Sequence, residues 1–287
     1  MIDGASQFLR LPARADDAHK NACGHVLAVA GSRSMPGAAA LVGLSALRAG
    51  AGLVTVLTAS DAQPIVAGYS PCLMVVPIAS DEEGRIFVGA DTKPHLAGKT
   101  VVVLGPGLGR SSALQFVVRW FYAECPLPLV IDADGLSNLA DAKVDLANHA
   151  GPRILTPHLG EFRRLTANPQ LGMEAAREEA SKFSARNQVV VVLKGPRSLI
   201  CDGQNKIENT TGNPGLATAG TGDVLSGVIA GLLAQGLPVF SAAVTGAYLH
   251  GRAGDLAAAS LGMHSLIATD VIENLPKAFQ ELAGRTE

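Results

Sequence analysis

Short, almost entirely apolar runs recur along this chain, and each one stops at a segment of glycine or polar residues. Such runs lack the alternation of polar and apolar residues found in strands with one solvent-exposed face, and they are typical of parallel strands buried between helices. A helical pattern over 38–49 joins the first two runs into a strand–helix–strand unit. The apolar runs and this unit together predict an α/β fold with a mainly parallel central sheet and helices on both faces. The runs that we predict as strands are 25–31, 53–57, 101–104, 128–131, 154–155 and 189–193.

The segments that follow these strands carry the unusual residues of the chain. Because the carboxyl ends of parallel strands meet at one edge of a sheet, we expect these segments to open onto one rim that holds the ligand site. They are Gly-Pro-Gly-Leu-Gly at 105–109, Asp-Ala-Asp-Gly at 132–135, Thr-Pro-His-Leu-Gly-Glu at 156–161 and Lys-Gly-Pro-Arg-Ser at 194–198.

The most distinctive segment is 213–223, which precedes a long apolar run. Gly220 and Gly222 flank Thr221, so the backbone there can approach a ligand closely. Asp223 opens a predicted helix, whose free N–H groups and dipole favour an anion such as a phosphate. The carboxylate could also accept a proton from an attacking hydroxyl. The same residues are explained equally by a tight turn followed by an Asp that caps the helix.

Two familiar phosphate-binding motifs are excluded. The segment 105–109 lacks the last glycine of a dinucleotide fingerprint, because Arg110 stands there. Lys99 and Thr100 resemble the end of a P-loop, but a strand follows them instead of a helix. A hydride-transfer site and a P-loop are therefore not predicted, and 220–223 remains the best phosphate site.

Other rim residues allow both functional and structural interpretations. Asp132 could organise Mg²⁺ through its waters, whereas Asp134 is explained as well by a helix cap. Pro157 suits the first position of a helix, and His158 is either a ligand contact or a solvated side chain. Segment 194–198 offers cations to phosphates, although a hairpin turn explains its Gly-Pro pair equally well.

One further histidine, His250, falls in a predicted helix over 242–251. We expect it to be a buried histidine with satisfied hydrogen bonds and not a catalytic base.

Composition excludes several classes of function. A formal net charge of −2 gives no general attraction for nucleic acid or an anionic membrane, so any anion site is local. The four cysteines are widely separated without a Cys-x-x-Cys pair, which predicts reduced thiols and no zinc site. Neither a signal peptide nor an apolar run of membrane-spanning length is recognisable. We expect a cytoplasmic protein that folds as one domain over 1–287.

Taken together, the rim segments resemble those of one family in their order and spacing. The chain resembles the ADP-dependent NAD(P)H-hydrate dehydratases, a branch of the ribokinase-like superfamily, from about His19 to the last predicted helix. This resemblance implies a ribokinase-like three-layer sandwich. Of the motifs that carry the resemblance, 211–223 is the most specific. The others are Met-Pro-Gly-Ala-Ala at 35–39 and the segments at 105–109, 132–134 and 156–161.

The resemblance implies repair of hydrated NADH or NADPH. In that family a phosphoryl group of ADP moves to the C6 hydroxyl of the S epimer, phosphate then leaves, and AMP is the second product. Asp223 matches the catalytic base, and Gly220, Thr221 and Gly222 match the anion hole. We expect the helix dipole to keep the Asp223 carboxyl ionised. The positions matching substrate contacts are Ala38, Gly107, Gly109, His158 and Asp223, and those matching nucleotide contacts are Lys194, Gly195, Pro196, Arg197, Ser198 and Gly222.

The resemblance also implies Mg²⁺, ADP as co-substrate with ATP as the alternative, and a homotetramer. Ala219, Asn21 and Ser198 depart from the family pattern, and of these only Ser198 bears on nucleotide preference. We expect a separate epimerase, because no epimerase domain fits before Gly24. The sequence leaves open a ribokinase-like kinase of a small alcohol or vitamin precursor, and less favourably a nucleotide-sensing module. It also leaves open the choice between NADH and NADPH hydrates.

Overall fold

A computed structural model of the chain describes residues 7–87 and 92–286. Within these residues, nine strands form one sheet in the order β3-β2-β1-β4-β5-β6-β7-β8-β9. Neighbours from β3 through β7 pair in parallel, and β8 and β9 extend the sheet antiparallel. The strands are β1 (His25–Val29), β2 (Leu53–Ala59), β3 (Met74–Ile78), β4 (Val101–Leu104), β5 (Leu129–Ile131), β6 (Arg153–Leu155), β7 (Val190–Leu193), β8 (Leu199–Cys201) and β9 (Lys206–Glu208).

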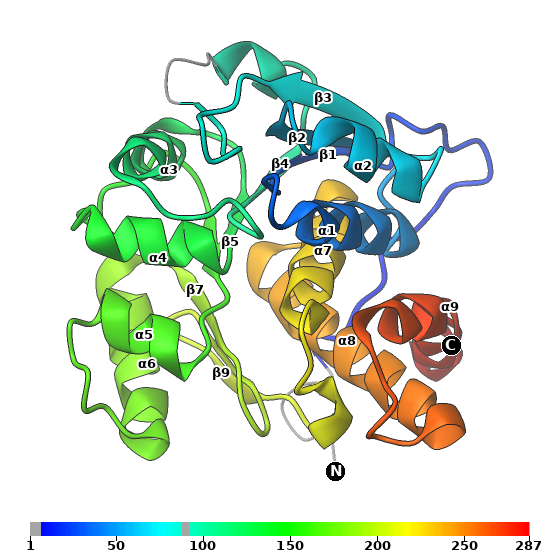
Figure 1. Cartoon of the computed structure of the whole chain (residues 1–287). Coiled ribbons are helices and arrows are strands. Elements are labelled where there is room, and N and C mark those ends of the chain that lie inside the picture. The colour runs from blue at the N-terminus through cyan, green and yellow to red at the C-terminus, as the bar shows by residue number, and fades with distance from the viewer. Residues whose placement is uncertain (1–6, 88–91, 287) are drawn as a thin grey trace.

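Helices cover both faces of this sheet, as Figure 1 shows. One face carries α3 to α6, and the other carries α1, α7, α8 and α9. Two short 3-10 turns, η1 (Lys93–Leu96) and η2 (Pro214–Leu216), lie in the connections. The helices are α1 (Pro36–Arg48), α2 (Gln63–Tyr69), α3 (Ser112–Glu124), α4 (Asp134–Asp141), α5 (Leu159–Leu165), α6 (Met173–Asn187), α7 (Thr221–Ala234), α8 (Val239–Leu261) and α9 (Ala268–Thr286).

Each central strand contributes to two separate hydrophobic cores. In β1, Val26 and Ala28 belong to the core under α1 and α7, whereas Leu27 and Val29 belong to the core under α3 to α6. Successive side chains of a strand point to opposite faces, so a strand buried on both faces must be apolar throughout. This confirms the predicted α/β architecture with a mainly parallel sheet.

The predicted strands are all present, but three observed strands were not predicted. The strand β3 lies at an edge of the sheet, and Met74 at its start is exposed. All five of its residues are apolar, but Pro77 lies within the run, and proline is found in sheets mainly on edge strands. The strands β8 and β9 are three residues long each, as are β5 and β6, but β9 has exposed charged residues at both ends and lacks the apolar pattern from which the other strands were predicted.

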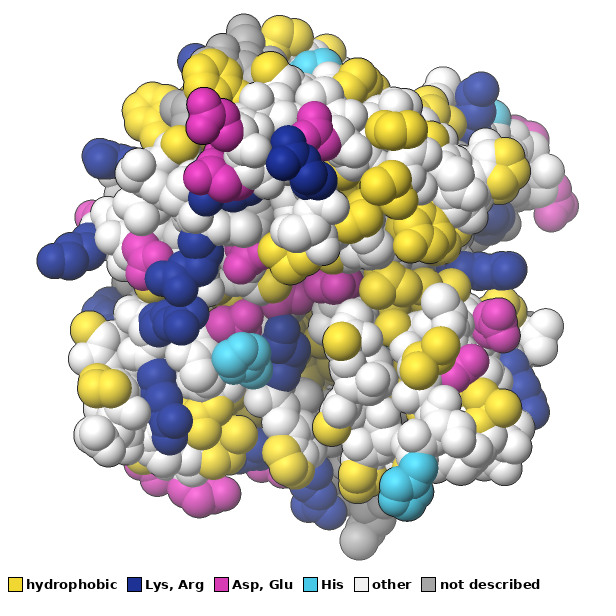
Figure 2. Space-filling model, viewed as in Figure 1, with side chains coloured by type: hydrophobic (Ala, Val, Ile, Leu, Met, Phe, Trp, Pro, Cys, Tyr) yellow, Lys and Arg dark blue, Asp and Glu magenta, His cyan; other side chains and the backbone are white. Residues whose placement is uncertain are grey.

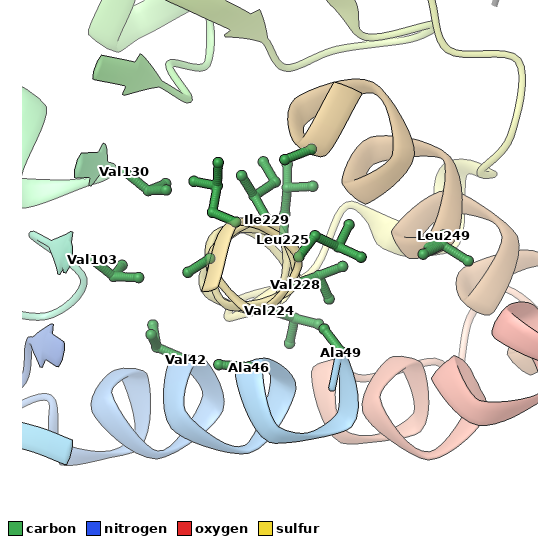
Figure 3. Close-up of a cluster of buried hydrophobic side chains, with 14 of the residues drawn as sticks. Val42, Ala46, Ala49, Val103, Val130, Val224, Leu225, Val228, Ile229 and Leu249 are labelled. Carbon is green, nitrogen blue, oxygen red and sulfur yellow. The ribbon is translucent and has the colours of Figure 1, made fainter. Parts of the chain in front are cut away.

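Helix α7 lies in the middle of one core. Figure 3 looks along its axis and shows Val103 from the sheet, Val42 from α1 and Leu249 from α8 around it. The helix approaches α1 closely at Gly227, where an added Cβ would lie 2.0 Å from Ser45 Oγ. A helix surrounded by other elements in this way is apolar all round, as the sequence of α7 is.

All four cysteines are free thiols in the structure. Over the described ranges, none of the helices combines the length and the apolar character that crossing a bilayer requires.

Candidate active site

The N-terminus of α7 presents free backbone donors at the carboxyl edge of the sheet. Gly220 precedes the helix in the left-handed region, with φ of 88°. The Thr221 hydroxyl donates to the carbonyls of Leu216 at 2.8 Å and Thr218 at 3.0 Å, which closes the turn. The first helical donor is Val224, whose N–H reaches the Gly220 carbonyl at 3.1 Å. The backbone N–H groups before it are therefore available to an anion, whereas the Thr221 hydroxyl is occupied.

Asp223 lies in the first turn of α7 and does not cap it. Its side chain makes no capping hydrogen bond, and the cap position belongs to Gly220. The interpretation of Asp223 as a helix cap is therefore wrong. Burial of the carboxyl, followed by the nearby charge of Asp132, raises the pKa of Asp223 to about 7, although Lys194 opposes this change. The expectation of a fully ionised carboxyl is corrected accordingly, because desolvation outweighs the helix dipole at this position.

A buried ion pair lies beside the start of α7. Lys194 Nζ donates to Asp132 Oδ1 at 2.6 Å, and Ser226 Oγ donates to Asp132 Oδ2 at 2.7 Å. Burial alone would raise the pKa of Asp132, but Lys194 and then Ser226 hold it below its ordinary value. A Cβ added at Gly222 would lie 3.3 Å from Lys194 Nζ. The ammonium group is thus held next to the backbone donors of α7.

Around Lys194 the carboxylates of β5, α5 and α7 converge. Burial alone would lower the pKa of Lys194, but Asp132, Glu161 and Asp223 raise it. Burial, opposed by Lys194, raises the pKa of Glu161. The ammonium group therefore stays charged in the site, where it can attract a further anion.

The carboxylates of Asp132 and Asp134 accept hydrogen bonds from protein groups and do not form a metal site with other side chains. Both carboxylate oxygens of Asp132 already accept hydrogen bonds, from Lys194, Ser226 and the Ala133 N–H at 2.9 Å. Over the described ranges, the His, Cys, Asp and Glu side chains form no group of three or more that could hold a metal ion. Asp134 Oδ2 accepts from the Gly109 N–H at 2.8 Å and is not a helix cap, since Ala133 precedes α4.

The glycine segment 105–109 is held from two sides. On one side Asp134 binds the Gly109 N–H, and Asn138 Nδ2 donates to the Gly109 carbonyl at 2.9 Å. On the other side Arg85 Nη1 donates to the Arg110 carbonyl at 2.9 Å. Asn138 and Arg85 were not predicted, because their role depends on contacts between segments far apart in the sequence.

The same segment contacts the start of α1. A Cβ added at Gly107, where φ is 66°, would lie 2.9 Å from the Ala38 Cβ. Glycine is required there both by the positive φ and by this close approach. The two positions that match substrate contacts, Ala38 and Gly107, are therefore neighbours in space.

His158 caps helix α5. Its Nδ1 accepts the N–H groups of Gly160 at 2.9 Å and Glu161 at 3.3 Å, and Glu161 Oε2 accepts the His158 N–H at 2.8 Å. These contacts form a capping box. The interpretation of Pro157 as the first helical residue is wrong, since α5 begins at Leu159. His158 also pairs with Lys194 in an isolated parallel bridge, which brings it to the same rim.

A cavity of about 580 Å³ opens beside α7. The hairpin between β7 and β8 forms one wall, so the turn interpretation of 194–198 holds and the same residues line the cavity. The opposite wall comes from 209–217 and from α8. Figure 2 shows the face drawn in Figure 1 with a groove across its middle, where acidic side chains gather on the floor and basic ones lie beside them. The lining residues include all five positions from Lys194 to Ser198, together with Thr221 and Gly222.

His250 also lines this cavity, from helix α8. Its Nε2 is buried and has no hydrogen-bond partner among the described residues. The expectation of a satisfied buried histidine is therefore wrong. Burial lowers its pKa to about 4, so the ring is neutral at physiological pH.

The family model for NAD(P)H-hydrate dehydratase matches residues 26–277. A bifunctional NAD(P)H-hydrate repair enzyme of Moorella thermoacetica is 42% identical over 284 residues, which are 97% of this chain and 53% of that protein. The chain thus spans about half the length of the bifunctional relatives that it matches.

Two comparisons extend over nearly the whole of both proteins. The ADP-dependent (S)-NAD(P)H-hydrate dehydratase of Bacillus subtilis is 35% identical over 274 residues, with 94% of each chain covered. The crystal structure of the ADP/ATP-dependent dehydratase of Bacillus subtilis, co-crystallised with ATP and Mg²⁺, superposes with a TM-score of 0.82 at 31% identity, covering 96% of this chain and 95% of that one. A ribokinase-like superfamily protein shares the fold, which confirms the predicted ribokinase-like sandwich. The extent of these matches shows that the chain belongs to the NAD(P)H-hydrate dehydratase family.

Proposed function

We propose that this chain repairs hydrated NADH and NADPH by nucleotide-dependent dehydration of the S epimer, with conversion of ADP to AMP and phosphate. One observation carries the proposal beyond family membership. A buried carboxyl, an ammonium group and free helix N–H groups lie together at the start of α7, where Lys194 and Gly222 also line a cavity of about 580 Å³. This combination suits phosphoryl transfer to a hydroxyl, in which catalysis rests on positioning and on stabilisation of charge.

Asp223 is the proposed base. The C6 hydroxyl loses its proton to the carboxylate while its oxygen bonds to the terminal phosphorus of ADP and AMP leaves. The C6–O bond then breaks, phosphate departs, and loss of a ring proton restores the double bond. A carboxyl with a pKa of about 7 suits this task, because it is a stronger base than an ordinary Asp and is still substantially ionised at neutral pH.

The nucleotide is proposed to bind in the cavity between the 194–198 hairpin and α8. Lys194 and the N–H groups of Gly222 and Asp223 would receive the phosphates, since cations and helix N-termini both stabilise such charge. Gly220 and Thr221 shape the turn that exposes these donors. Asp132 supports the arrangement by fixing Lys194 at 2.6 Å.

The hydrated nicotinamide is proposed to bind on the other side of Asp223. Ala38, Gly107 and Gly109 are the residues proposed to contact it, and the close approach of Gly107 to Ala38 brings two of them together at this rim. His158 stands at the same rim with its Nδ1 accepting hydrogen bonds in the capping box, so its Nε2 carries the proton, 3.5 Å from Glu161 Oε1 on a largely exposed side chain.

Mg²⁺ is proposed to enter with the nucleotide and not to occupy a site built by the protein. In the described parts of the chain no group of three ligating side chains exists, and the Asp132 oxygens are already engaged. Mg²⁺ commonly binds proteins through substrate phosphates and retained waters, and we assign no step to it. The related Bacillus subtilis enzyme was co-crystallised with ATP and Mg²⁺. ADP is the proposed co-substrate, with ATP as the alternative.

Two further expectations belong to this proposal. The relatives named bifunctional are about twice as long as this chain, which supports an epimerase acting on the same substrate outside these 287 residues. A homotetramer and a cytoplasmic location also remain proposals.

The decisive experiment supplies hydrated NADH with ADP, and then with ATP, to the wild-type protein and to Asp223→Asn. Recovery of the dihydronicotinamide absorbance with the wild type, and at least about a thousandfold slower recovery with the variant, is the expected result. Both ligands should still bind the variant. Accumulation of a stable phosphorylated alcohol would instead indicate the kinase, and no recovery with either nucleotide would refute the dehydratase.

A further inference from the structure

One nitrogen in the proposed nucleotide cavity lacks a hydrogen-bond partner. It is Nε2 of His250, on the turn of α8 whose other residues Ala247 and Gly251 also line the cavity. Across the described residues, two other buried side-chain atoms share this condition, Thr58 Oγ1 and Ser181 Oγ, and neither belongs to the cavity lining. Of these three unpartnered atoms, only His250 Nε2 therefore belongs to a residue that lines the cavity.

An unpaired buried polar group lowers the stability of the unliganded protein. Leaving such a group without a partner costs about 1–3 kcal/mol relative to a site where it is bonded. A leucine of similar size would occupy the same position without this cost. The histidine at 250 is thus unfavourable for the empty site, and a ligand that supplies the missing partner would remove the penalty.

Hydrogen bonds join the two segments of the cavity wall around His250. Asn209 Nδ2 donates to the Ala247 carbonyl at 3.0 Å, and the Thr211 hydroxyl donates to the Tyr248 carbonyl at 2.8 Å. One turn further along α8, Asp255 accepts the Gly212 N–H at 3.0 Å. These bonds fasten the segment 209–212 to α8 on either side of His250 and so fix the position of this part of the cavity wall.

The chemistry of the ring restricts what that ligand group can be. Burial lowers the pKa of His250 to about 4, a hydrogen bond between the ring and the Thr221 backbone opposes this change, and Lys194 lowers the pKa further. A neutral imidazole carries one N–H and one lone pair, so it pairs with a neutral donor or acceptor and offers no charge to a phosphate. In the proposed site the phosphates of the nucleotide are received by Lys194 and the N–H donors of α7. The neutral part of the nucleotide that is left for His250 is its nucleoside.

We propose that His250 recognises the nucleotide by a hydrogen bond to a neutral group of its nucleoside, a ribose hydroxyl or a polar atom of the base. This inference rests on the proposed function, because it places the nucleotide in the cavity beside α7. His250 then acts as a binding residue for the co-substrate and takes no part in proton transfer.

The test measures binding of ADP by calorimetry, and unfolding of the unliganded protein, for wild type, His250→Leu and His250→Gln. His250→Leu is expected to weaken ADP about tenfold while the unliganded melting temperature stays the same or rises. His250→Gln keeps donor and acceptor atoms and should retain affinity within about threefold. Ser181→Ala removes an unpartnered hydroxyl outside the cavity and should leave ADP affinity unchanged.

Three ligands locate the contact. Inorganic pyrophosphate should bind wild type and His250→Leu equally, because it lacks the nucleoside. If the ribose is the partner, the penalty of His250→Leu disappears with 2′-deoxy-ADP or 3′-deoxy-ADP. If the base is the partner, the penalty persists with these and disappears with a diphosphate of an altered purine.

Three results would overturn the inference. They are unchanged ADP affinity in His250→Leu, an equal loss for pyrophosphate, and a lower unliganded melting temperature of that variant. Failure of the wild type itself to bind ADP or ATP would instead refute the nucleotide site of the proposed function, so the two failures are distinguishable.

Discussion

At the scale of single residues, the site shows how burial changes what a side chain can do. Asp223 and Asp132 are both carboxylates near α7, yet the pKa of Asp223 is raised to about 7 while that of Asp132 is lowered. The difference lies in their partners. Asp132 accepts direct hydrogen bonds from Lys194 and Ser226, whereas Asp223 has Asp132 as a nearby like charge. One carboxylate is therefore structural, and the other is left basic.

Asp223 should reduce the stability of the unliganded protein as pH rises above about 4. Its pKa is raised from the ordinary 3.8, so the folded state holds the proton more tightly and loses stability as pH rises from about 4 to about 7. Asp223→Asn should therefore be more stable than wild type by up to about 4 kcal/mol at pH 8 and nearly equal to it at pH 4. Denaturant unfolding at both pH values measures this. An equal difference at pH 4 and pH 8 would contradict it.

His158 should combine two separable roles, because its two ring nitrogens have different surroundings. Asn at this position keeps an oxygen that can cap α5 but removes the group at Nε2, whereas Gln keeps a donor near Nε2 and caps poorly. His158→Asn should keep its melting temperature and lose about tenfold in kcat/KM for the hydrated dinucleotide. His158→Gln should lose about 1 kcal/mol of stability and retain more activity. A fully active His158→Asn would show that Nε2 does not contact the substrate.

At the scale of elements, helix α7 is positioned by its close packing on α1. Gly227 and Gly231 lie one turn apart on the side that faces α1. An added Cβ would lie 2.4 Å from the Val42 carbonyl oxygen at the first position and 2.6 Å from the Ala46 carbonyl oxygen at the second. Backbone atoms cannot move aside as a flexible side chain can. The glycines therefore fix how far the N-terminus of α7 projects toward the proposed anion site.

Gly227→Ala should destabilise the protein by about 1–3 kcal/mol, measured by denaturant unfolding. Helix propensity alone predicts the opposite sign, since Ala is favoured over Gly by about 1 kcal/mol in a helix interior. The matched control is Gly284→Ala in α9, where an added Cβ meets nothing within 4 Å. That variant should gain up to about 1 kcal/mol. Equal effects of the two substitutions would show that α1 does not constrain α7.

The elements that hold the glycine segment show where reasoning from sequence stops. Arg85, Asp134 and Asn138 all bind the backbone of 109–110, the first from the connection between β3 and β4 and the other two from α4. None of them belongs to a motif with a defined spacing. Their contact with the segment exists only because the sheet order brings α4 and the connection before β4 to the same edge.

At the scale of the whole molecule, two cores share one sheet, and the site lies where the strands end. The wholly apolar strands determined the parallel sheet, because only a strand covered on both faces lacks polar positions. Every predicted rim segment then lies at the carboxyl edge of the sheet, as the parallel arrangement requires. The strands β3, β8 and β9 were not predicted: β3 contains Pro77, and β9 has exposed charged residues at both ends.

The sequence by itself determined the fold class, the rim and the family, because strand periodicity and motif spacing are local properties of the chain. Only the tertiary structure decided what each polar group does. It paired Asp132 with Lys194 across 62 positions, placed Nδ1 of His158 in a capping box and left Nε2 of His250 without a partner. The physical reason is that pKa values and hydrogen-bond satisfaction depend on burial and on neighbours distant in sequence, which spacing along the chain does not encode.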